Sequence, residues 1–349
     1  MRKYVLRFFI LLLLGGWTIH ADEELNVTMV YHQNTTSEDT TTSTQTFQGR
    51  LESYRLAPQP FHNEGHILAG YNTKPDGSGD YYIPRSYMAY FDLVDHMPEF
   101  HLYAQWWPMD STYGGVIFIG DSYSIHANWA DYAAKEIGLS GYLISDLGGT
   151  GFVNEIWEQP KDKPTNFEVL LEDAAILAGE ESNRAQYHYI VVEGGYNDQY
   201  YEEERVIEAI SSFVQKAREL FPNARIVVGM NGEHTTNPDV QLMMKNVTLT
   251  YKKACEQNGI AYLEGIETVL EQNPEYFSED GFHPNQAGGA KIGAYTAAYL
   301  KHMQQDTTMP TTPISTQTKG MMGGWVFLPI GMLLAGGLLY LKHRKRSAL

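Results

Sequence analysis

The stretch Ile117-Phe118-Ile119-Gly120-Asp121-Ser122 joins a wholly apolar run to a serine, with only Gly-Asp between them. The uncharged run from 115 to 120 predicts a strand that is buried on both faces, as in the middle of a parallel sheet. In open sheets of this kind, ligands bind at the carboxyl ends of the strands. Ser122 therefore stands where the pattern predicts a functional site.

Further along the chain, apolar runs typical of strands alternate with helical patterns. The expected strands are 115–120, 141–145, 187–192, 225–230 and 260–263, and the expected helices are 127–137, 167–178, 202–220, 238–257 and 285–302. Alternation of this kind predicts a parallel sheet that helices cover on both faces. We therefore expect an α/β fold with three layers, α/β/α.

Three further motifs carry groups that chemistry at Ser122 would need. They are Gly148-Gly149-Thr150-Gly151, Gly195-Tyr196-Asn197-Asp198 and Asp280-Gly281-Phe282-His283-Pro284. A serine hydroxyl is a poor nucleophile at neutral pH unless an imidazole takes its proton and a carboxylate orients that imidazole. Ser122, His283 and Asp280 are therefore the candidate nucleophile, general base and orienting carboxylate.

The order of serine, glycine block, asparagine and Asp-x-x-His resembles the SGNH hydrolases, also called GDSL esterases, over residues 113–303. The resemblance implies a three-layer fold with a parallel sheet, and ester hydrolysis through an acyl-enzyme. It also implies an oxyanion hole made by the backbone amide of Ser122, an amide of the glycine block and the side chain of Asn197. Gly149 aligns best as the glycine donor, with Gly148 and Gly151 as alternatives.

Each of these residues also has a purely structural interpretation. Ser122 could be the N-cap of a helix beginning near Ser124, and His283 could be an exposed loop histidine before a helix. The full set in this order favours the catalytic interpretation. We expect Asp121 to hold the turn by hydrogen bonds and Asp198 to order its loop.

Composition excludes several other kinds of chemistry. The formal net charge of −17 argues against a nucleic-acid partner, which would require clustered Lys and Arg. The implied mechanism requires no cofactor, and no histidine-rich spacing or cysteine pair predicts a catalytic metal. The single cysteine, Cys255, lies in an amphipathic helical pattern, where a buried thiol is expected.

The ends of the chain predict where the protein works. Basic residues before an apolar run and a small-residue cleavage site predict a secretory signal peptide over 1–21. A Thr/Pro-rich linker (304–320) leads to the uncharged stretch 323–341, which is long enough to span about 30 Å of hydrocarbon. The basic tail 342–349 follows. We therefore expect a single-pass protein of the cell membrane with its catalytic domain outside the cell.

The segment before the hydrolase-like region carries a second resemblance. The stretches His66 to Gly79, Tyr81-Tyr82 and Leu102 to Trp106 are similar to a Listeria-Bacteroides repeat, a β-rich module of Gram-positive surface proteins, over residues 26–107. Asp76-Gly77-Ser78-Gly79 predicts a turn, and the alternation over 100–106 predicts a half-buried strand. The polar run 34–45 is expected to form a long exposed loop.

Together these features predict a cell-surface serine esterase. Its expected substrates are acylated carbohydrates, with O-acetyl groups preferred, or lipid esters in the alternative of a lipase or lysophospholipase. The stretch 323–341 is the expected membrane contact, and the N-terminal module would contact a cell-wall polymer. The alternative that is not an enzyme is a surface adhesion protein whose hydrolase-like domain is inactive.

Overall fold

The structure is a computed structural model that describes residues 25–49, 53–84, 87–89, 93, 97–110, 112–157, 164–230, 238–270 and 273–305. The predicted signal peptide (1–21), the membrane helix (323–341), the basic tail (342–349) and nearly all of the predicted linker (304–320) lie outside these residues. Among the helices that are described, none is both long and apolar enough to cross a bilayer.

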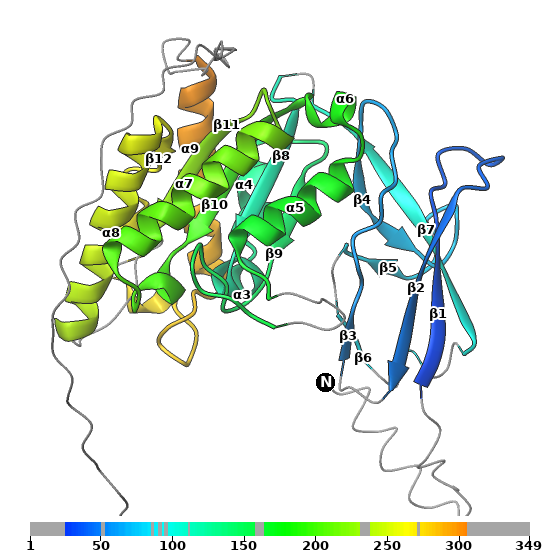
Figure 1. The fold of residues 1–349 in the computed structure, drawn as a ribbon, viewed down its shortest axis with the longest axis horizontal. Coiled ribbons are helices and arrows are strands. Elements are labelled where there is room, and N and C mark those ends of the chain that lie inside the picture. The colour runs from blue at the N-terminus through cyan, green and yellow to red at the C-terminus, as the bar shows by residue number, and fades with distance from the viewer. Residues whose placement is uncertain are drawn as a thin grey trace, which may run out of the picture. The chain divides into compact units, whose positions relative to one another are not determined.

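The centre of the described chain is a parallel sheet with the strand order β12-β11-β10-β8-β9 (Figure 1). The strands are β8 (Gly115–Gly120), β9 (Leu143–Asp146), β10 (Tyr187–Gly194), β11 (Arg225–Met230) and β12 (Ala261–Tyr262). Strands β8 and β10 are hydrogen-bonded neighbours although β9 lies between them in the chain. The strand order therefore reverses between β8 and β10, and such a switch point is where open sheets bind ligands.

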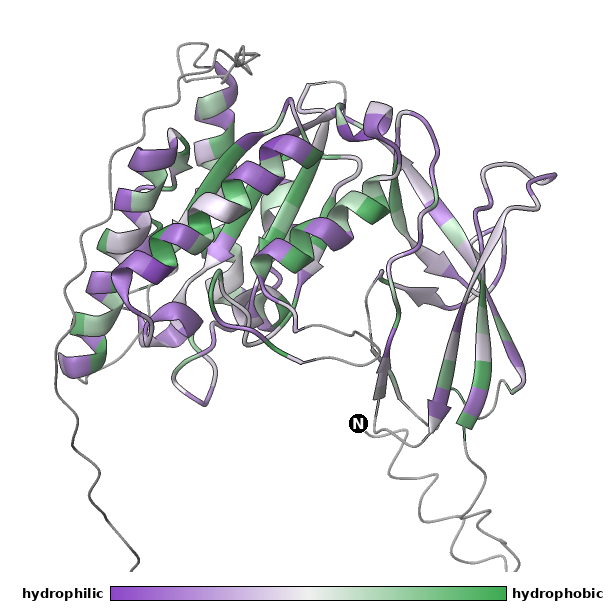
Figure 2. Ribbon diagram, in the orientation of Figure 1, coloured by the Kyte–Doolittle hydropathy of each residue, from purple (hydrophilic) through white to green (hydrophobic). Residues whose placement is uncertain are grey.

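Helices cover both faces of this sheet, as the α/β prediction required. One face packs against α4 (Trp129–Ile137) and α9 (Gln286–Gln305), and the other packs against α5 (Phe167–Ala178), α7 (Glu203–Leu220) and α8 (Pro238–Asn258). Along β8, the side chains of Val116 and Phe118 belong to the hydrophobic cluster on the face of α4 and α9. Those of Ile117 and Ile119 belong to the cluster on the opposite face. Figure 2 shows these central strands as hydrophobic, since neither face meets water.

The predicted strands and helices of this region agree closely with those observed, although several boundaries differ. The helix expected over 127–137 is α4, which begins at Trp129, and a separate helix, α3 (Ser122–Ala127), comes directly before it. Asn128 between the two helices adopts a left-handed conformation with φ 53°. Asparagine tolerates this conformation better than most residues, and it ends the first helix. The strand expected over 260–263 is shorter than predicted, because only the two residues of β12 form it. Among the described strands, β12 pairs with β11 alone.

Most of the residues that the structure describes between 25 and 108 lie in strands. They are β1 (Leu25–His32), β2 (Thr42–Gly49), β3 (Ser53–Arg55), β4 (His66–Asn72), β5 (Tyr81–Tyr82), β6 (Tyr87–Ala89) and β7 (Glu99–Pro108). The larger sheet has the order β2-β1-β7-β4-β5, and β3 pairs with β6. The prediction of a loop over 34–45 is wrong for its last four residues, because residues 42–45 belong to β2. Threonine suits this edge strand, where alternate side chains face water.

The N-terminal strands contact β9, the edge strand of the parallel sheet. The Arg55 Nη2 atom donates a hydrogen bond of 2.6 Å to the backbone carbonyl of Asp146 at the end of β9. The ring of Trp107 lies 6.1 Å from that of Tyr142, and β4 also contacts β9. A single hydrophobic cluster therefore runs from β1 through to the α5 face of the parallel sheet.

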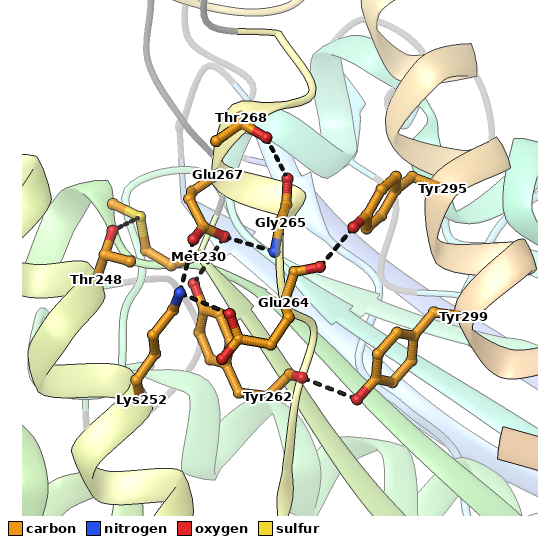
Figure 3. A network of polar contacts seen from close by, with 10 residues as sticks. All are labelled: Met230, Thr248, Lys252, Tyr262, Glu264, Gly265, Glu267, Thr268, Tyr295 and Tyr299. Atoms are coloured by element: carbon orange, nitrogen blue, oxygen red, sulfur yellow. Dashed lines mark hydrogen bonds and ion pairs between the residues drawn. The ribbon is translucent and has the colours of Figure 1, made fainter. Parts of the chain in front are cut away.

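A network of polar contacts fixes the chain after β12 (Figure 3). The Lys252 ammonium on α8 contacts Glu264 at 2.7 Å and Glu267 at 2.8 Å. From α9, the Tyr295 hydroxyl donates to the Glu264 carbonyl (2.5 Å), and the Tyr299 hydroxyl donates to a carbonyl of β12 (2.9 Å). These bonds tie α8 and α9 to the segment that continues toward Asp-Gly-Phe-His.

Glycines allow α9 to approach α3 and α4 closely. A Cβ atom built on Gly289 would lie 1.8 Å from the Ala127 carbonyl oxygen, and one on Gly293 would lie 2.6 Å from the Trp129 carbonyl oxygen. Neither separation is sterically allowed, because the two carbonyl oxygens are backbone atoms and cannot rotate away. The helix that follows the Asp-x-x-His turn is thus fitted directly against the helix that begins with Ser122.

We expect Gly289→Ala to destabilise the protein by about 1–3 kcal/mol, because the added methyl overpacks the α9–α3 contact. Helix propensity alone predicts the opposite sign, a gain of about 1 kcal/mol. Urea denaturation of the full chain measures the difference, and Ala294→Gly at an exposed position of α9 serves as the propensity control. A more stable Gly289→Ala variant would contradict the close approach.

Candidate active site

Ser122 occupies the first position of α3, directly after the end of β8. The N-cap of this helix is Asp121, whose Oδ1 atom accepts a hydrogen bond of 2.9 Å from the Tyr123 amide. The structural interpretation of Ser122 as an N-cap before a helix at Ser124 is therefore wrong, because Asp121 already does this. The backbone amide of a first-turn residue has no partner within its helix, so that of Ser122 is suited to bind negative charge.

The Asp280–His283 turn forms a charge-assisted hydrogen-bonded pair. The imidazole Nδ1 atom of His283 lies 2.8 Å from Asp280 Oδ2, and Asp280 Oδ1 accepts 2.9 Å bonds from the amides of Phe282 and His283. The bond to His283, followed by those two backbone bonds, lowers the pKa of Asp280 to about 2. An ionised carboxylate only accepts hydrogen bonds, so Nδ1 carries the imidazole hydrogen and Nε2 presents a lone pair.

The helix of Ser122 packs directly against this turn. The Tyr123 hydroxyl donates to the Phe282 carbonyl at 3.1 Å, and the rings of His126 and His283 have centroids 4.3 Å apart. The Gln286 side chain also donates to the His126 carbonyl at 3.1 Å. The structure thus brings together the serine and Asp-x-x-His blocks, which are distant in the sequence.

His126 was not identified from the sequence as a candidate residue. It follows Ser122 by one helical turn, so both side chains emerge on the same side of α3. The spacing Ser-x-x-x-His after a strand was the available signal. It has meaning only once α3 is known to begin at Ser122 itself.

The three candidate glycines have different surroundings. A Cβ atom on Gly148 would lie 3.7 Å from the Ser122 Cβ, so this glycine adjoins the serine. Gly149 has φ 83°, which favours glycine, and a side chain on Gly151 would meet Asp198 Oδ1 at 2.3 Å. Gly151 therefore makes room for Asp198, while the assignment of Gly149 as the oxyanion donor stays a prediction.

Asn197, at the centre of the short helix η1 (Tyr196–Asp198), joins the ends of several strands. Its Nδ2 atom donates to the Thr150 carbonyl at 2.8 Å and to Asp121 Oδ2 at 3.3 Å. An amide nitrogen carries two hydrogens, so both are engaged. The bond to Asp121 is longer and therefore weaker than the bond to Thr150.

Asp198, which was expected to order its own loop, binds the loop after the glycine block. Its carboxylate accepts hydrogen bonds from the amides of Phe152 (2.8 Å), Val153 (3.0 Å) and Asn154 (2.9 Å), and from the Tyr251 hydroxyl (2.7 Å). The side chain is fully buried. Because its neighbour Asn197 lies on the same short helix, the loop and the amide are fixed together.

We expect Asp198→Ala to destabilise the protein by at least about 3 kcal/mol, because it leaves buried amides without acceptors. Asp198→Asn keeps one acceptor oxygen in place and should lose less. Chemical denaturation measures both variants. Equal stability of Asp198→Ala and the unchanged protein would contradict this role.

Asp121 is an ionisable group enclosed in the site. Burial is the main reason that its pKa rises to about 7, and the charges of Asp198 and Asp146 add to the shift against the bond from the Tyr123 amide. In the unfolded chain the carboxyl ionises near pH 4. The folded state therefore binds this proton more tightly, and the resulting stability is present below pH 4 and is lost as pH rises to about 7.

We expect Asp121→Asn to flatten the decrease in stability between pH 4 and pH 7, by at most about 4 kcal/mol. Asparagine is also a good N-cap, so α3 should persist. Unfolding free energies measured across this range test the prediction. Parallel pH profiles of the two proteins would show that Asp121 is ionised in the folded state.

Comparison with known protein families matches the region that contains these motifs. Residues 118–291 match the model of the GDSL-like Lipase/Acylhydrolase family. The chain is also similar to a GDSL-like lipase from Bacteroides thetaiotaomicron, with 16% identity over 56% of this chain and 90% of that one and a TM-score of 0.39.

Two carbohydrate esterases of family two are similar to the chain as well. The enzyme from Corynascus thermopiles, solved with its carbohydrate binding domain, has 16% identity over 66% of this chain and 74% of that one, with a TM-score of 0.44. An active site mutant from Clostridium thermocellum has 15% identity over 57% and 65%, with a TM-score of 0.42. No curated protein matches the chain.

The assignment rests on the family match, since the TM-scores are low. The match lies within the expected range 113–303 and does not extend to residues 26–107, where the Listeria-Bacteroides resemblance stays a prediction. It includes the serine, glycine, asparagine and Asp-x-x-His blocks. Residues 118–291 therefore form a GDSL/SGNH hydrolase domain.

Proposed function

We propose that this protein is a serine ester hydrolase in which Ser122 is the nucleophile. The observation that carries the proposal is the Asp280–His283 pair, held against the first turn of the Ser122 helix by Tyr123 and His126. Because Nδ1 of His283 is bound to the carboxylate, Nε2 is the atom that can take a proton from a hydroxyl.

Hydrolysis would proceed in two halves. In the first, the Ser122 hydroxyl attacks the ester carbonyl as its proton moves to His283 Nε2, and the imidazolium then gives that proton to the departing alcohol. In the second, water loses a proton to the same nitrogen as it attacks the acyl-enzyme, and the imidazolium then gives that proton to the Ser122 oxygen as the acid is released. The Asp280 carboxylate stabilises the imidazolium in both halves.

The tetrahedral intermediate in each half carries a negative charge on the former carbonyl oxygen. We assign its donors as the Ser122 amide, the Gly149 amide and the Asn197 side chain, each contributing about 3 kcal/mol in comparable enzymes. The helix N-terminus at Ser122 adds a favourable dipole. Asn197 is oriented for this task by Thr150, while its weaker bond to Asp121 can be exchanged.

The preferred substrate is an O-acetyl group on carbohydrate. The predicted signal peptide and membrane helix would hold the enzyme outside the cell beside envelope polysaccharides. Two aromatic residues near the motif loops, Trp157 and Tyr200, are 70% and 73% exposed. Such rings offer flat apolar surface together with a polar atom, which suits a sugar.

We expect the full chain to hydrolyse p-nitrophenyl acetate and acetylated polysaccharide, and Ser122→Ala to lower kcat about 10⁴-fold or more. Ser140→Ala makes the same chemical change outside the site and should leave kcat unchanged. Equal rates for Ser122→Ala and the unchanged protein would contradict the assignment. Absence of activity on every ester would favour an adhesion protein.

The same assay distinguishes the acetyl esterase from a lipase. Esters of increasing chain length should be cleaved progressively more slowly if the site is built for acetyl groups. Rates that rise with chain length would favour a lipase or lysophospholipase instead.

A further inference from the structure

Arg55 links the N-terminal strands to the segment beside Ser122. Its side chain is only 6% exposed, and its Nη2 atom donates the 2.6 Å hydrogen bond to the backbone carbonyl of Asp146. Arginine is almost never fully buried unless it is paired, because removing its charge from water is costly. The backbone at Arg55 is held as well, since it pairs with Tyr87 of β6 and its carbonyl accepts a 3.0 Å bond from Gln45 of β2. The guanidinium therefore extends from a fixed point in the N-terminal strands.

Asp146 lies at the end of β9, just before the glycine block, and connects this arginine to the serine turn. The Asp146 Oδ2 atom accepts a 2.7 Å hydrogen bond from the hydroxyl of Ser124, a buried residue of α3. The amide of the next residue, Leu147, donates a 3.2 Å bond to the Gly120 carbonyl at the end of β8. The residue that Arg55 holds thus contacts the nucleophile's helix by its side chain and begins the segment that contacts the end of β8.

We propose that Arg55 is a positioning residue for ester hydrolysis, which acts through Asp146 on the Ser122 helix and on the glycine block. A misplacement of about 1 Å between reacting groups can lower a rate about 10²-fold, so an anchor at this point affects catalysis. The proposal rests on the proposed function for its catalytic consequence. It makes the strands that precede the family match at residue 118 a part of the catalytic unit.

The test is steady-state kinetics with p-nitrophenyl acetate, using the full chain carrying Arg55→Met at a temperature where every variant is folded. The kcat should fall about tenfold with little change in KM, because the reacting groups are displaced while the substrate contacts remain. Arg55→Lys keeps a charged donor and should restore part of kcat.

Arg225→Met is the matched control. The Arg225 Nη1 atom also donates to a backbone carbonyl, that of Met303, at 2.7 Å. Arg225 begins β11, so it lies at the end of the strand opposite to the catalytic edge. This variant should lower the Tm and leave kcat unchanged.

A double-mutant cycle tests whether Arg55 acts through Asp146. Ser124→Ala removes the bond that Asp146 accepts from α3. If Arg55 and Ser124 hold the same residue, the combined variant should lose less unfolding free energy, and less log kcat, than the two single variants together. Arg225→Met shares no partner with Ser124→Ala, so that pair should be additive.

An unchanged kcat in Arg55→Met, or an equal loss of kcat in Arg225→Met, would overturn the proposal and leave the proposed function intact. Absence of activity in the unchanged protein would overturn the proposed function. The cycle in unfolding free energy needs no activity, so it still tests the link between Arg55 and α3. Coupled changes would support that link, and additive changes would overturn it.

Discussion

The Asp198 carboxylate is the interaction on which the site's architecture depends. It binds the loop after the glycine block, the Tyr251 hydroxyl from α8 and, through the chain itself, the end of β10. These parts meet at the reversal of strand order between β8 and β10. Without Asp198, the backbone amides of residues 152–154 would lose their hydrogen-bond acceptor. One buried acceptor thus holds the Asn197 side chain at the edge of the sheet where Ser122 begins its helix.

Much of this arrangement could be predicted from local pattern. Strands buried on both faces leave continuous apolar runs, so β8, β10 and β11 were evident, and the amphipathic helices between them followed. The buried Cys255 was also predicted correctly, and burial raises the pKa of its thiol to about 12, which keeps it protonated. Ser122, Asp280 and His283 were found because each lies in a short motif next to an element boundary.

What could not be predicted depends on contacts between distant segments. The contact of His126 with His283 could be predicted only if the packing of α9 against α3 were known. The glycines of α9 allow this packing, but their presence in the sequence does not predict it. The parallel pairing of β1 with β7 joins strands that are far apart in the chain, and no local pattern specifies it.

The contact of Arg55 and β4 with β9 has a consequence for solubility. A strand at the edge of a sheet presents unpaired backbone groups that can pair with another chain, and natural proteins cover or interrupt such edges. Here the N-terminal strands lie against that edge, so the hydrolase fold is shielded by sequence outside its own family match. The preceding segment therefore covers the β9 edge of the parallel sheet.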